Sequence, residues 1–306
     1  MRVRSFLRTL LVIGVAGSAA AVPSCSNKTG STSTQSSLNA PIPEPPGTPE
    51  NSPTLAHISK EGKVRVGVKF DVPLFGLKDP ITGNLSGFDV EISKMIAAAL
   101  FPADPNPVDR IEFVEALSKN RERLLKDGTV DLIVSTYTIN DARKQFVDFA
   151  GPYYVAGQDI LAKKTEIDAG RIRGIGDVGH KRVCSVTGST SLANLRAAAP
   201  TADTTVTKDK YSECFEALKA GRVDAMTTDD VILLGLASGS AEFGITGNPF
   251  HTEPYGIGIA KGDSEMRTYV NNVLAGAFRD GRWRRAFQAT VGTTGAIAPS
   301  PPELDP

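Results

Sequence analysis

The chain has 306 residues and a mass of 32.4 kDa, which suggests about two domains of ordinary size. Hydrophobic residues make up 41% of the chain and charged residues 22%, as in globular proteins that bury a real core. Lys and Arg together number 34, as do Asp and Glu, so the formal net charge is zero. Because binding to nucleic acid through its phosphates needs a basic surplus or a basic face, we expect no nucleic-acid partner.

Residues 1–24 are typical of a lipoprotein signal peptide. Three arginines near the start precede an apolar run at 10–22, which is too short to span a bilayer comfortably. The run ends in Val22-Pro23-Ser24-Cys25, which resembles a bacterial lipobox, although Pro23 is an uncommon residue at its position. We therefore expect Cys25 to be lipidated and to anchor the protein to the cell membrane, outside the cytoplasm. Ordinary cleavage nearby, with Cys25 as a spare thiol, is the alternative.

Residues 25–54 predict a disordered tether. Ser, Thr, Asn, Gly and Pro dominate 26–53, and such a segment cannot bury enough surface to offset the entropy of ordering. A coil of this length has a root-mean-square reach of roughly 30 Å. The folded body would thus stay close to a membrane without being embedded in it.

Two cysteines remain besides Cys25, namely Cys184 and Cys214. An export signal together with an even pair predicts one disulfide in an oxidising compartment, and two buried free thiols are the alternative. A disulfide closing a loop of about 30 residues is worth roughly 3–4 kcal/mol of stability. The three histidines lie far apart and no Cys/His pair has zinc-ligand spacing, so we expect no metal site and no cofactor.

The folded body begins near Leu55, and its first part alternates strands with helices. Apolar alternation and a glycine stop signal predict a strand, helix, strand, helix and strand, in chain order at 63–68, 93–100, 111–114, 117–126 and 130–134. The third strand is apolar on both faces, as in a covered parallel sheet. The βαβαβ order predicts an α/β domain with right-handed crossovers.

The pattern then restarts. The expected strands are 182–186, 204–206 and 223–227, and the expected helices are 191–199, 212–220, 264–278 and 283–290. Residues 125–132 and 218–225 are similar, because each runs from a helix end through a glycine into a strand that carries an aspartate. We therefore expect two similar α/β lobes, and two connections between them would make a hinge beside a ligand cleft.

A polar motif at 136–143 follows the third strand and continues into 147–154. These residues resemble the polar amino-acid solute-binding proteins of bacterial ABC importers, whose pattern is hydroxyl-x-hydroxyl-Ile-Thr-x-x-Arg and then Val-Asp-Phe-Ser-x-Pro-Tyr. Asn140 stands for the usual Thr, and Ala150 for the usual Ser. The resemblance covers about 55–292, and within the family it is closest to glutamate/aspartate binders. Four further motifs occur in the family's order, at 87–90, 188–190, 224–230 and 280–283.

The resemblance implies an α/β protein of the type II periplasmic-binding fold, with two α/β lobes joined by a two-strand hinge. We expect lobe 1 at 55–154 and 253–298, lobe 2 at 155–252, and a disordered tail at 299–306. The implied function is extracytoplasmic: the lobes close on an acidic amino acid, glutamate or aspartate, and present it to ABC permease subunits. We expect the protein to be a monomer.

A free α-amino acid is a zwitterion, so burying it requires both charges to be matched. Arg143 is placed to grip the α-carboxylate bidentately, with Thr136 and Thr138 adding hydroxyl or backbone contacts. The N–H groups of Gly188-Ser189-Thr190, at a strand-to-helix junction, can receive the same carboxylate. The alternatives are a solvated helix charge for Arg143 and an ordinary helix cap for the Gly-Ser-Thr segment.

The family match assigns the α-ammonium to Asp229, and the neighbouring Asp230 either competes for this role or starts the next helix. Lys69 and Arg121 match positions that face the ligand side chain in glutamate/aspartate binders, where a second carboxylate needs positive charge. The alternatives are that Lys69 points outward and that Arg121 pairs with Glu122 or Asp127. Tyr211 is a further predicted contact with the ligand side chain, and the cleft wall is assigned to Phe70 or Asp71.

Three other functions can share this fold. An enzyme on the same fold needs an acid or base near the substrate carbon, and the candidate motifs contain no histidine, so we expect no enzyme. A glutamine-binding protein would share the fold and most of the site. An amino-acid sensor that reports to a membrane kinase would share the ligand chemistry, so the sequence leaves these last two functions open.

Overall fold

The computed structural model describes residues 51–305, all of which belong to one compact unit of the chain, Ile42–Pro306. The predicted signal peptide, Cys25 and residues 25–50 of the predicted tether lie outside the described residues. None of the helices between residues 51 and 305 has both the length and the apolar character needed to cross a membrane.

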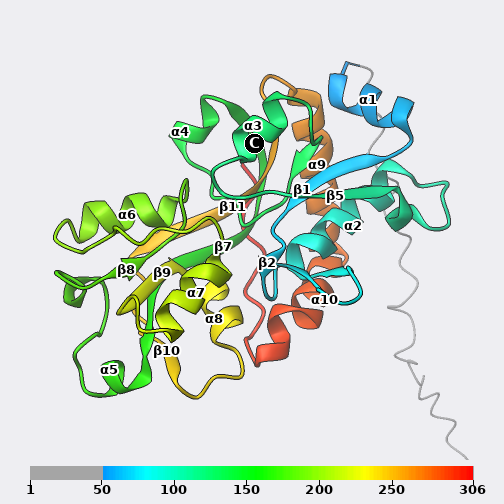
Figure 1. Ribbon diagram of the computed structural model, residues 1–306. Helices are drawn as coiled ribbons and strands as arrows, with labels where there is room; N and C mark the ends of the chain where they lie inside the picture. The colour runs from blue at the N-terminus through cyan, green and yellow to red at the C-terminus, as the bar shows by residue number, and fades with distance from the viewer. Residues whose placement is uncertain (1–50, 306) are drawn as a thin grey trace, which may run out of the picture. The chain divides into compact units, whose positions relative to one another are not determined.

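Most strands of the described chain join one eight-stranded sheet with the order β5-β1-β6-β11-β7-β9-β8, and β10 pairs with β7 at the side (Figure 1). β1 pairs with β5 and β6 in parallel, and β8 pairs with β9 in parallel. The strands are β1 (Val64–Val68), β5 (Ile111–Glu115), β6 (Leu132–Ile133), β7 (Val147–Lys163), β8 (Val183–Cys184), β9 (Ala225–Asp229), β10 (Phe243–Ile245) and β11 (His251–Ala260). The parallel pairs confirm the predicted α/β fold class.

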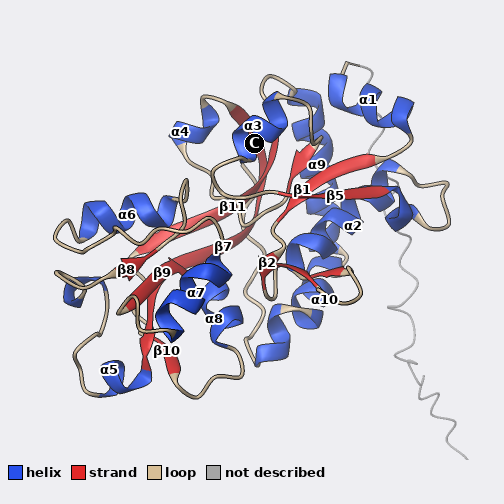
Figure 2. Cartoon of the chain, viewed as in Figure 1, coloured by secondary structure: helices blue, strands red, loops and turns tan. Residues whose placement is uncertain are grey.

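Helices cover this sheet, and Figure 2 shows them in blue around the red strands. They are α1 (Pro53–Glu61), α2 (Phe88–Leu100), α3 (Arg121–Lys126), α4 (Asp141–Lys144), α5 (Lys164–Asp168), α6 (Thr190–Ala198), α7 (Tyr211–Lys219), α8 (Asp230–Ala237), α9 (Ser264–Arg279) and α10 (Arg282–Ala289). A second sheet of three short strands, β2 (Asp71–Val72), β3 (Gly76–Lys78) and β4 (Leu85–Ser86), precedes α2.

Two long antiparallel strands, β7 and β11, connect the two lobes of the fold (Figure 1). The start of β7 pairs with the end of β11, where β11 also pairs with β6, whereas Gln158–Ala162 of β7 pair with β9. The same two strands therefore belong to the β1-β5-β6 lobe at one end and to the β8-β9-β10 lobe at the other. This is the predicted two-strand hinge.

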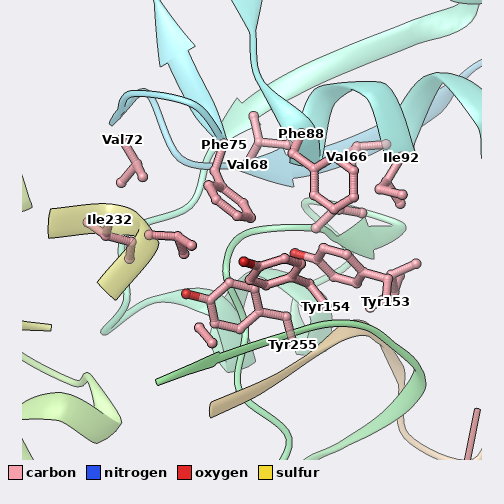
Figure 3. Packing of buried hydrophobic residues seen from close by; sticks show 14 of the residues in the cluster. Val66, Val68, Val72, Phe75, Phe88, Ile92, Tyr153, Tyr154, Ile232 and Tyr255 are labelled. Carbon is pink, nitrogen blue, oxygen red and sulfur yellow. The ribbon is translucent and has the colours of Figure 1, made fainter. Parts of the chain in front are cut away.

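An aromatic cluster packs against the two hinge strands (Figure 3). Phe75 makes edge contacts with Tyr154 of β7 and Tyr255 of β11, with ring centres 5.6 and 5.8 Å apart. Phe88, at the start of α2, contacts Tyr154 and Trp283, so the first lobe and the hinge share one core. These five large rings therefore form one close-packed aromatic core at the hinge strands.

The structure differs from the sequence predictions mainly at element boundaries. The body begins with α1 at Pro53, because Ser52 caps this helix and donates a hydrogen bond to Asp263. Residues 204–206 form no strand. Nearby, Asp203 and Lys208 form isolated β-bridges with Arg182 and Val186. The second predicted helix starts at Arg121 and not at 117, since a turn precedes it.

The predicted disordered tail also differs from the structure. Residues 299–305 lack regular secondary structure but lie against the body. The N–H of Asp305 donates to the carbonyl of Gly151, and the Asn271 amide donates to the carbonyl of Asp305. Leu304 packs beside the main core. These contacts hold the tail against the body, which the composition of the tail alone does not indicate.

The predicted disulfide is confirmed. Cys184 and Cys214 are bonded across a sequence separation of 30 residues and join β8 to α7 in the second lobe. We expect the double variant Cys184→Ser/Cys214→Ser to lose roughly 3–4 kcal/mol of unfolding free energy, because the loop is no longer closed in the unfolded chain. Chemical denaturation with and without reductant measures this, and the double variant, which should be indifferent to reductant, is the control. Equal stability of the two proteins in the absence of reductant would contradict the prediction.

Candidate ligand-binding site

The structure buries the residues that the sequence predicts to bind the ligand. Lys69 and Arg121 are each 2% exposed, which excludes the alternative that Lys69 points outward. Arg121 does not pair with Glu122 or Asp127, because these carboxylates lie near Arg143 and Arg123 instead. The other predicted residues that are buried are Thr136, Thr138, Arg143, Ser189, Tyr211 and Asp229, and Thr190 is partly buried.

Three cationic side chains of the first lobe lie close together. Lys69 follows β1, and its Nζ donates to Oγ of Ser118 at 2.8 Å. Arg121 begins α3 and donates from Nη1 to the carbonyls of Ser135 and Thr136 at 3.0 and 3.3 Å. Arg143 lies in α4. Burial and the charge of Arg121 both lower the pKa of Lys69, to about 7, and also lower the pKa of Arg143, to about 10.

Arg143 is oriented by its own loop. Its backbone N–H is capped by Oδ1 of Asn140 at 2.9 Å, and its Nη1 donates to the carbonyl of Thr138 at 2.6 Å. Asn140, which replaces the family's usual Thr, therefore still caps the short helix α4. Nη2 lies 3.5 Å from the carbonyl of Gly188 in the second lobe.

The segment Gly188-Ser189-Thr190 opens α6, as predicted, but the Ser189 hydroxyl is already occupied. Its Oγ donates to the carbonyl of Val186 at 2.8 Å and accepts from the N–H of Leu192 at 3.0 Å, which is an N-cap. The groups of this segment that can receive a carboxylate are therefore the first-turn N–H groups, which have no intrahelical acceptor.

Asp229 ends β9 on the second lobe. It accepts from Oη of Tyr255 at 2.5 Å and from Oγ of Ser191 at 3.3 Å. Burial raises the pKa of this carboxyl, and the nearby charge of Glu253 raises it further. A bound ammonium would act in the opposite direction and favour the ionised form of Asp229. Asp230 is the first residue of α8 and accepts from the N–H of Val231, which fits the alternative role of starting a helix.

Residues 188–191 connect Arg143, predicted to bind the α-carboxylate, with Asp229, predicted to bind the α-ammonium. Gly188 contacts Arg143 through its carbonyl, and Ser191 contacts Asp229 through its hydroxyl. Between them, Oγ1 of Thr190 lies 3.4 Å from Oγ1 of Thr138 on the first lobe. A cation on one lobe and a carboxylate on the other therefore lie at the two ends of one four-residue segment.

Sequence reasoning missed Asp89, which positions the loop that carries Thr136 and Thr138. Asp89 is fully buried and accepts from the N–H of Thr136 at 2.9 Å and from Oη of Tyr153 at 2.5 Å. Thr136 has a φ of 41°, a strained value for a non-glycine residue that the bond to Asp89 helps to hold. The only signal in the sequence is the motif Gly87-Phe88-Asp89-Val90, which by itself assigns no role to the aspartate.

Glu253 was also missed. It lies on the hinge strand β11, is fully buried, and accepts from Oγ1 of Thr190 at 2.8 Å and from Nδ2 of Asn194 at 2.9 Å. Nδ1 of His251 lies 3.0 Å from the same carboxylate. Because Thr190 donates its proton to Glu253, its oxygen can accept from a ligand ammonium but cannot donate to a ligand carboxylate.

The two lobes are in contact at the rim of the site. Lys119 pairs with Asp209 at 2.5 Å, and Lys210 pairs with Glu115 at 2.6 Å. A pocket of about 500 Å³ lies nearby between the lobes. Its lining comes from both of them, with Glu122, Asn140, Ala142, Arg143 and Phe146 on one side and Gly188, Ser189, Thr190 and Ala193 on the other.

The comparisons with known proteins agree with this geometry. Residues 64–292 match the family "Bacterial extracellular solute-binding proteins, family 3", so the chain belongs to this family. It is 40% identical to the "ABC transporter glutamine-binding protein GlnH" of Bacillus subtilis, over 78% of this chain and 84% of the relative. It is 36% identical to the "Glutamate-binding protein GluB" of Corynebacterium efficiens, over 80% of this chain and 84% of the relative.

Solved structures show the same fold. The solute receptor for L-cysteine of Neisseria gonorrhoeae superposes with a TM-score of 0.74 at 29% identity, covering 80% of this chain and 97% of that one. The protein is therefore an amino-acid solute-binding protein of an ABC importer and not an enzyme. Such proteins work outside the cytoplasm and interact with permease subunits.

We expect Glu253→Gln to weaken the binding of glutamate and glutamine alike, by about tenfold, because both ligands carry the α-ammonium and both lose a nearby negative charge. Isothermal titration calorimetry with each amino acid measures this. Glu242→Gln, which changes an exposed glutamate of the second lobe, is the control. Unchanged dissociation constants in Glu253→Gln would show that Glu253 has no part in binding.

We also expect the ion pairs at the rim to favour the state in which the lobes touch. The double variant Lys119→Ala/Lys210→Ala should raise the ligand dissociation constant by about two- to thirtyfold, since it removes two pairs that are each worth roughly 0.2–1 kcal/mol. The difference should shrink in high salt. Lys164→Ala is the matched control, because its partner Asp168 is in the same lobe. A double variant that binds as tightly as the wild type in low salt would contradict this role.

Proposed function

We propose that this protein binds an acidic amino acid, glutamate or aspartate, between its two lobes and delivers it to an ABC permease. The observation that carries the proposal is the clustering of three buried cations, Lys69, Arg121 and Arg143, on the first lobe. Arg143 and Asp229 suffice for the α-carboxylate and the α-ammonium, which leaves Lys69 and Arg121 for the ligand side chain. A second carboxylate would match that charge.

The free hydrogen-bonding capacity of Arg121 supports this assignment. Its Nη1 is engaged by two carbonyls, but its Nε is buried and has no hydrogen-bond partner within residues 51–305. A buried N–H of a cation without an acceptor is costly, and a ligand carboxylate is a suitable acceptor. Tyr211 adds to the same side of the site, since Nζ of Lys69 lies 5.7 Å from its ring centre.

Glutamine is the second candidate, because the glutamine-binding relative from Bacillus subtilis is 40% identical to this chain. The pKa of Lys69 bears on the choice. Since burial lowers it to about 7, Lys69 can become neutral at little cost and would then tolerate an uncharged amide. The pH dependence of binding therefore separates the two ligands.

Three further features of the proposal concern the protein as a whole. We propose that Cys25 carries a lipid anchor, that the anchored protein is a monomer, and that lobe 1 comprises 55–154 and 253–298 with lobe 2 at 155–252. The support for the anchor is the sequence Val22-Pro23-Ser24-Cys25 and the polar tether after it.

We expect glutamate to bind at least tenfold more tightly than glutamine, and Arg121→Ala to weaken glutamate binding by roughly 10- to 100-fold with a smaller effect on glutamine, because a charged hydrogen bond is lost. Titration calorimetry with a panel of amino acids measures both. Arg123→Ala is a matched control, since Arg123 is exposed and pairs with Asp127 in the same helix. Equal affinity for glutamate and glutamine, unchanged in Arg121→Ala, would overturn the acidic-ligand assignment.

We expect glutamate affinity to fall as the pH rises above about 7, the pKa of free Lys69. A bound carboxylate favours protonated Lys69, so binding above this pH takes up a proton, and the dissociation constant rises by up to about tenfold per pH unit. Calorimetry in two buffers of different ionisation enthalpy detects the proton. Lys69→Met removes this dependence and serves as the control. If glutamate binds without proton uptake at pH values above 7, Lys69 does not contact the ligand carboxylate.

A further inference from the structure

One aromatic ring contacts both arginines of the site. Tyr137 stands between Thr136 and Thr138 and is fully buried. The guanidinium carbon of Arg121 lies 4.2 Å from the centre of this ring, and that of Arg143 lies 4.8 Å from it. Both distances are typical of cation–π contacts.

The ring itself is held from several directions. Its hydroxyl donates to Oε1 of Glu122 at 2.7 Å, and its centre lies 4.8 Å from that of Phe149. The hinge strand β11 passes so close that a Cβ on Gly258 would come within 2.9 Å of the ring. Glu122 also lies 3.6 Å from Nε of Arg143, so it ties the hydroxyl of Tyr137 to one of the two cations. The position of the ring is therefore fixed by the first lobe and by the hinge.

A fixed ring also fixes the spacing of the two cations. Two guanidinium groups in a buried site repel each other, and each is attracted to the negative face of the aromatic ring. Because both guanidinium carbons lie within 4.8 Å of one ring centre, neither can move far without losing this contact. The proposed function assigns Arg143 to the α-carboxylate and Arg121 to the side-chain carboxylate, so this spacing corresponds to the distance between two groups of one ligand.

We propose that Tyr137 is a specificity-determining positioning residue, whose ring holds Arg121 and Arg143 at the spacing that suits the two carboxylates of an acidic amino acid. This inference rests on the proposed function. Tyr137 acts through the two arginines, and its removal loosens both of them. Glutamine, which needs only the α-carboxylate contact of Arg143, depends on the ring less than glutamate does.

The experiment compares three substitutions at position 137 by calorimetry with glutamate and with glutamine. Tyr137→Phe keeps the ring and loses the bond to Glu122, Tyr137→Leu removes the ring, and pentafluorophenylalanine keeps its shape but removes the negative face. We expect Tyr137→Phe to keep the glutamate-to-glutamine affinity ratio within about twofold of the wild type. We expect the other two to lower the ratio by about fivefold or more, with thermal melts showing that the ligand-free variants are folded.

The outcomes separate the two proposals. If the wild type prefers glutamate but the pentafluorophenylalanine variant weakens both ligands in the same proportion, Tyr137 only fills space and the inference is wrong. If Tyr137→Leu fails to fold, the pentafluorophenylalanine variant alone decides, because its shape is close to that of the native ring. If the wild type binds glutamine as tightly as glutamate, the acidic-ligand function fails first and the role of Tyr137 fails with it.

Discussion

Three buried cations in one region are the constraint on which the rest of this site depends. Taking a charge out of water costs several kcal/mol unless hydrogen bonds and opposite charges replace the solvent, and neighbouring like charges add to the cost. The fold meets part of the cost with the carbonyls of Ser135, Thr136 and Thr138, which accept from Arg121 and Arg143. Thr136, in the middle of this loop, has a positive φ of 41°, and its N–H donates to Asp89. The polar loop at 135–138 thus has an electrostatic role.

The hinge is more than a connection between lobes, because it supplies part of the site. Tyr255 and Glu253 of β11 contact Asp229 and Thr190 on the second lobe. Gln158 of β7 donates to the carbonyl of Ser191 at 2.9 Å. The base of the second lobe's site is therefore bonded to the same strands that lead into the first lobe. Tyr255 of the hinge thus contacts Asp229, the residue that we propose for the ligand ammonium, through a hydrogen bond of 2.5 Å.

Much of the fold could be predicted from the sequence, because its elements carry strong local signals. Glycine after two of the helices and apolar strands indicate the two α/β units, and the disulfide follows from the cysteine count and the export signal. The prediction of a strand at 204–206 is wrong, because a segment of only three residues carries too weak an apolar pattern to distinguish a strand from a turn. The prediction of a disordered tail is wrong for 299–305, because contacts with partners distant in the sequence, such as Asn271, hold these residues in place. Such contacts leave no local signal in the sequence.

The candidate site was predictable only in part, for physical reasons. The motif resemblance pointed to Arg143 and Asp229, but burial decided between alternatives for Lys69 and Arg121, and burial depends on tertiary packing. A single glutamate in a strand, such as Glu253, belongs to no sequence motif, so nothing in the sequence around it indicates that its carboxylate is buried. For the Gly-Ser-Thr segment the sequence left a carboxylate-binding role and a helix cap open, and the hydrogen bonds of the Ser189 hydroxyl show that it caps the helix.

A crystal structure of the protein with bound glutamate tests the central claim most directly. The account predicts the α-carboxylate at Arg143 and the first turn of α6, the α-ammonium at Asp229, and the side-chain carboxylate at Nε of Arg121 and at Lys69. A ligand bound with its α-ammonium remote from Asp229, or with its side-chain carboxylate in contact with neither Lys69 nor Arg121, would contradict it.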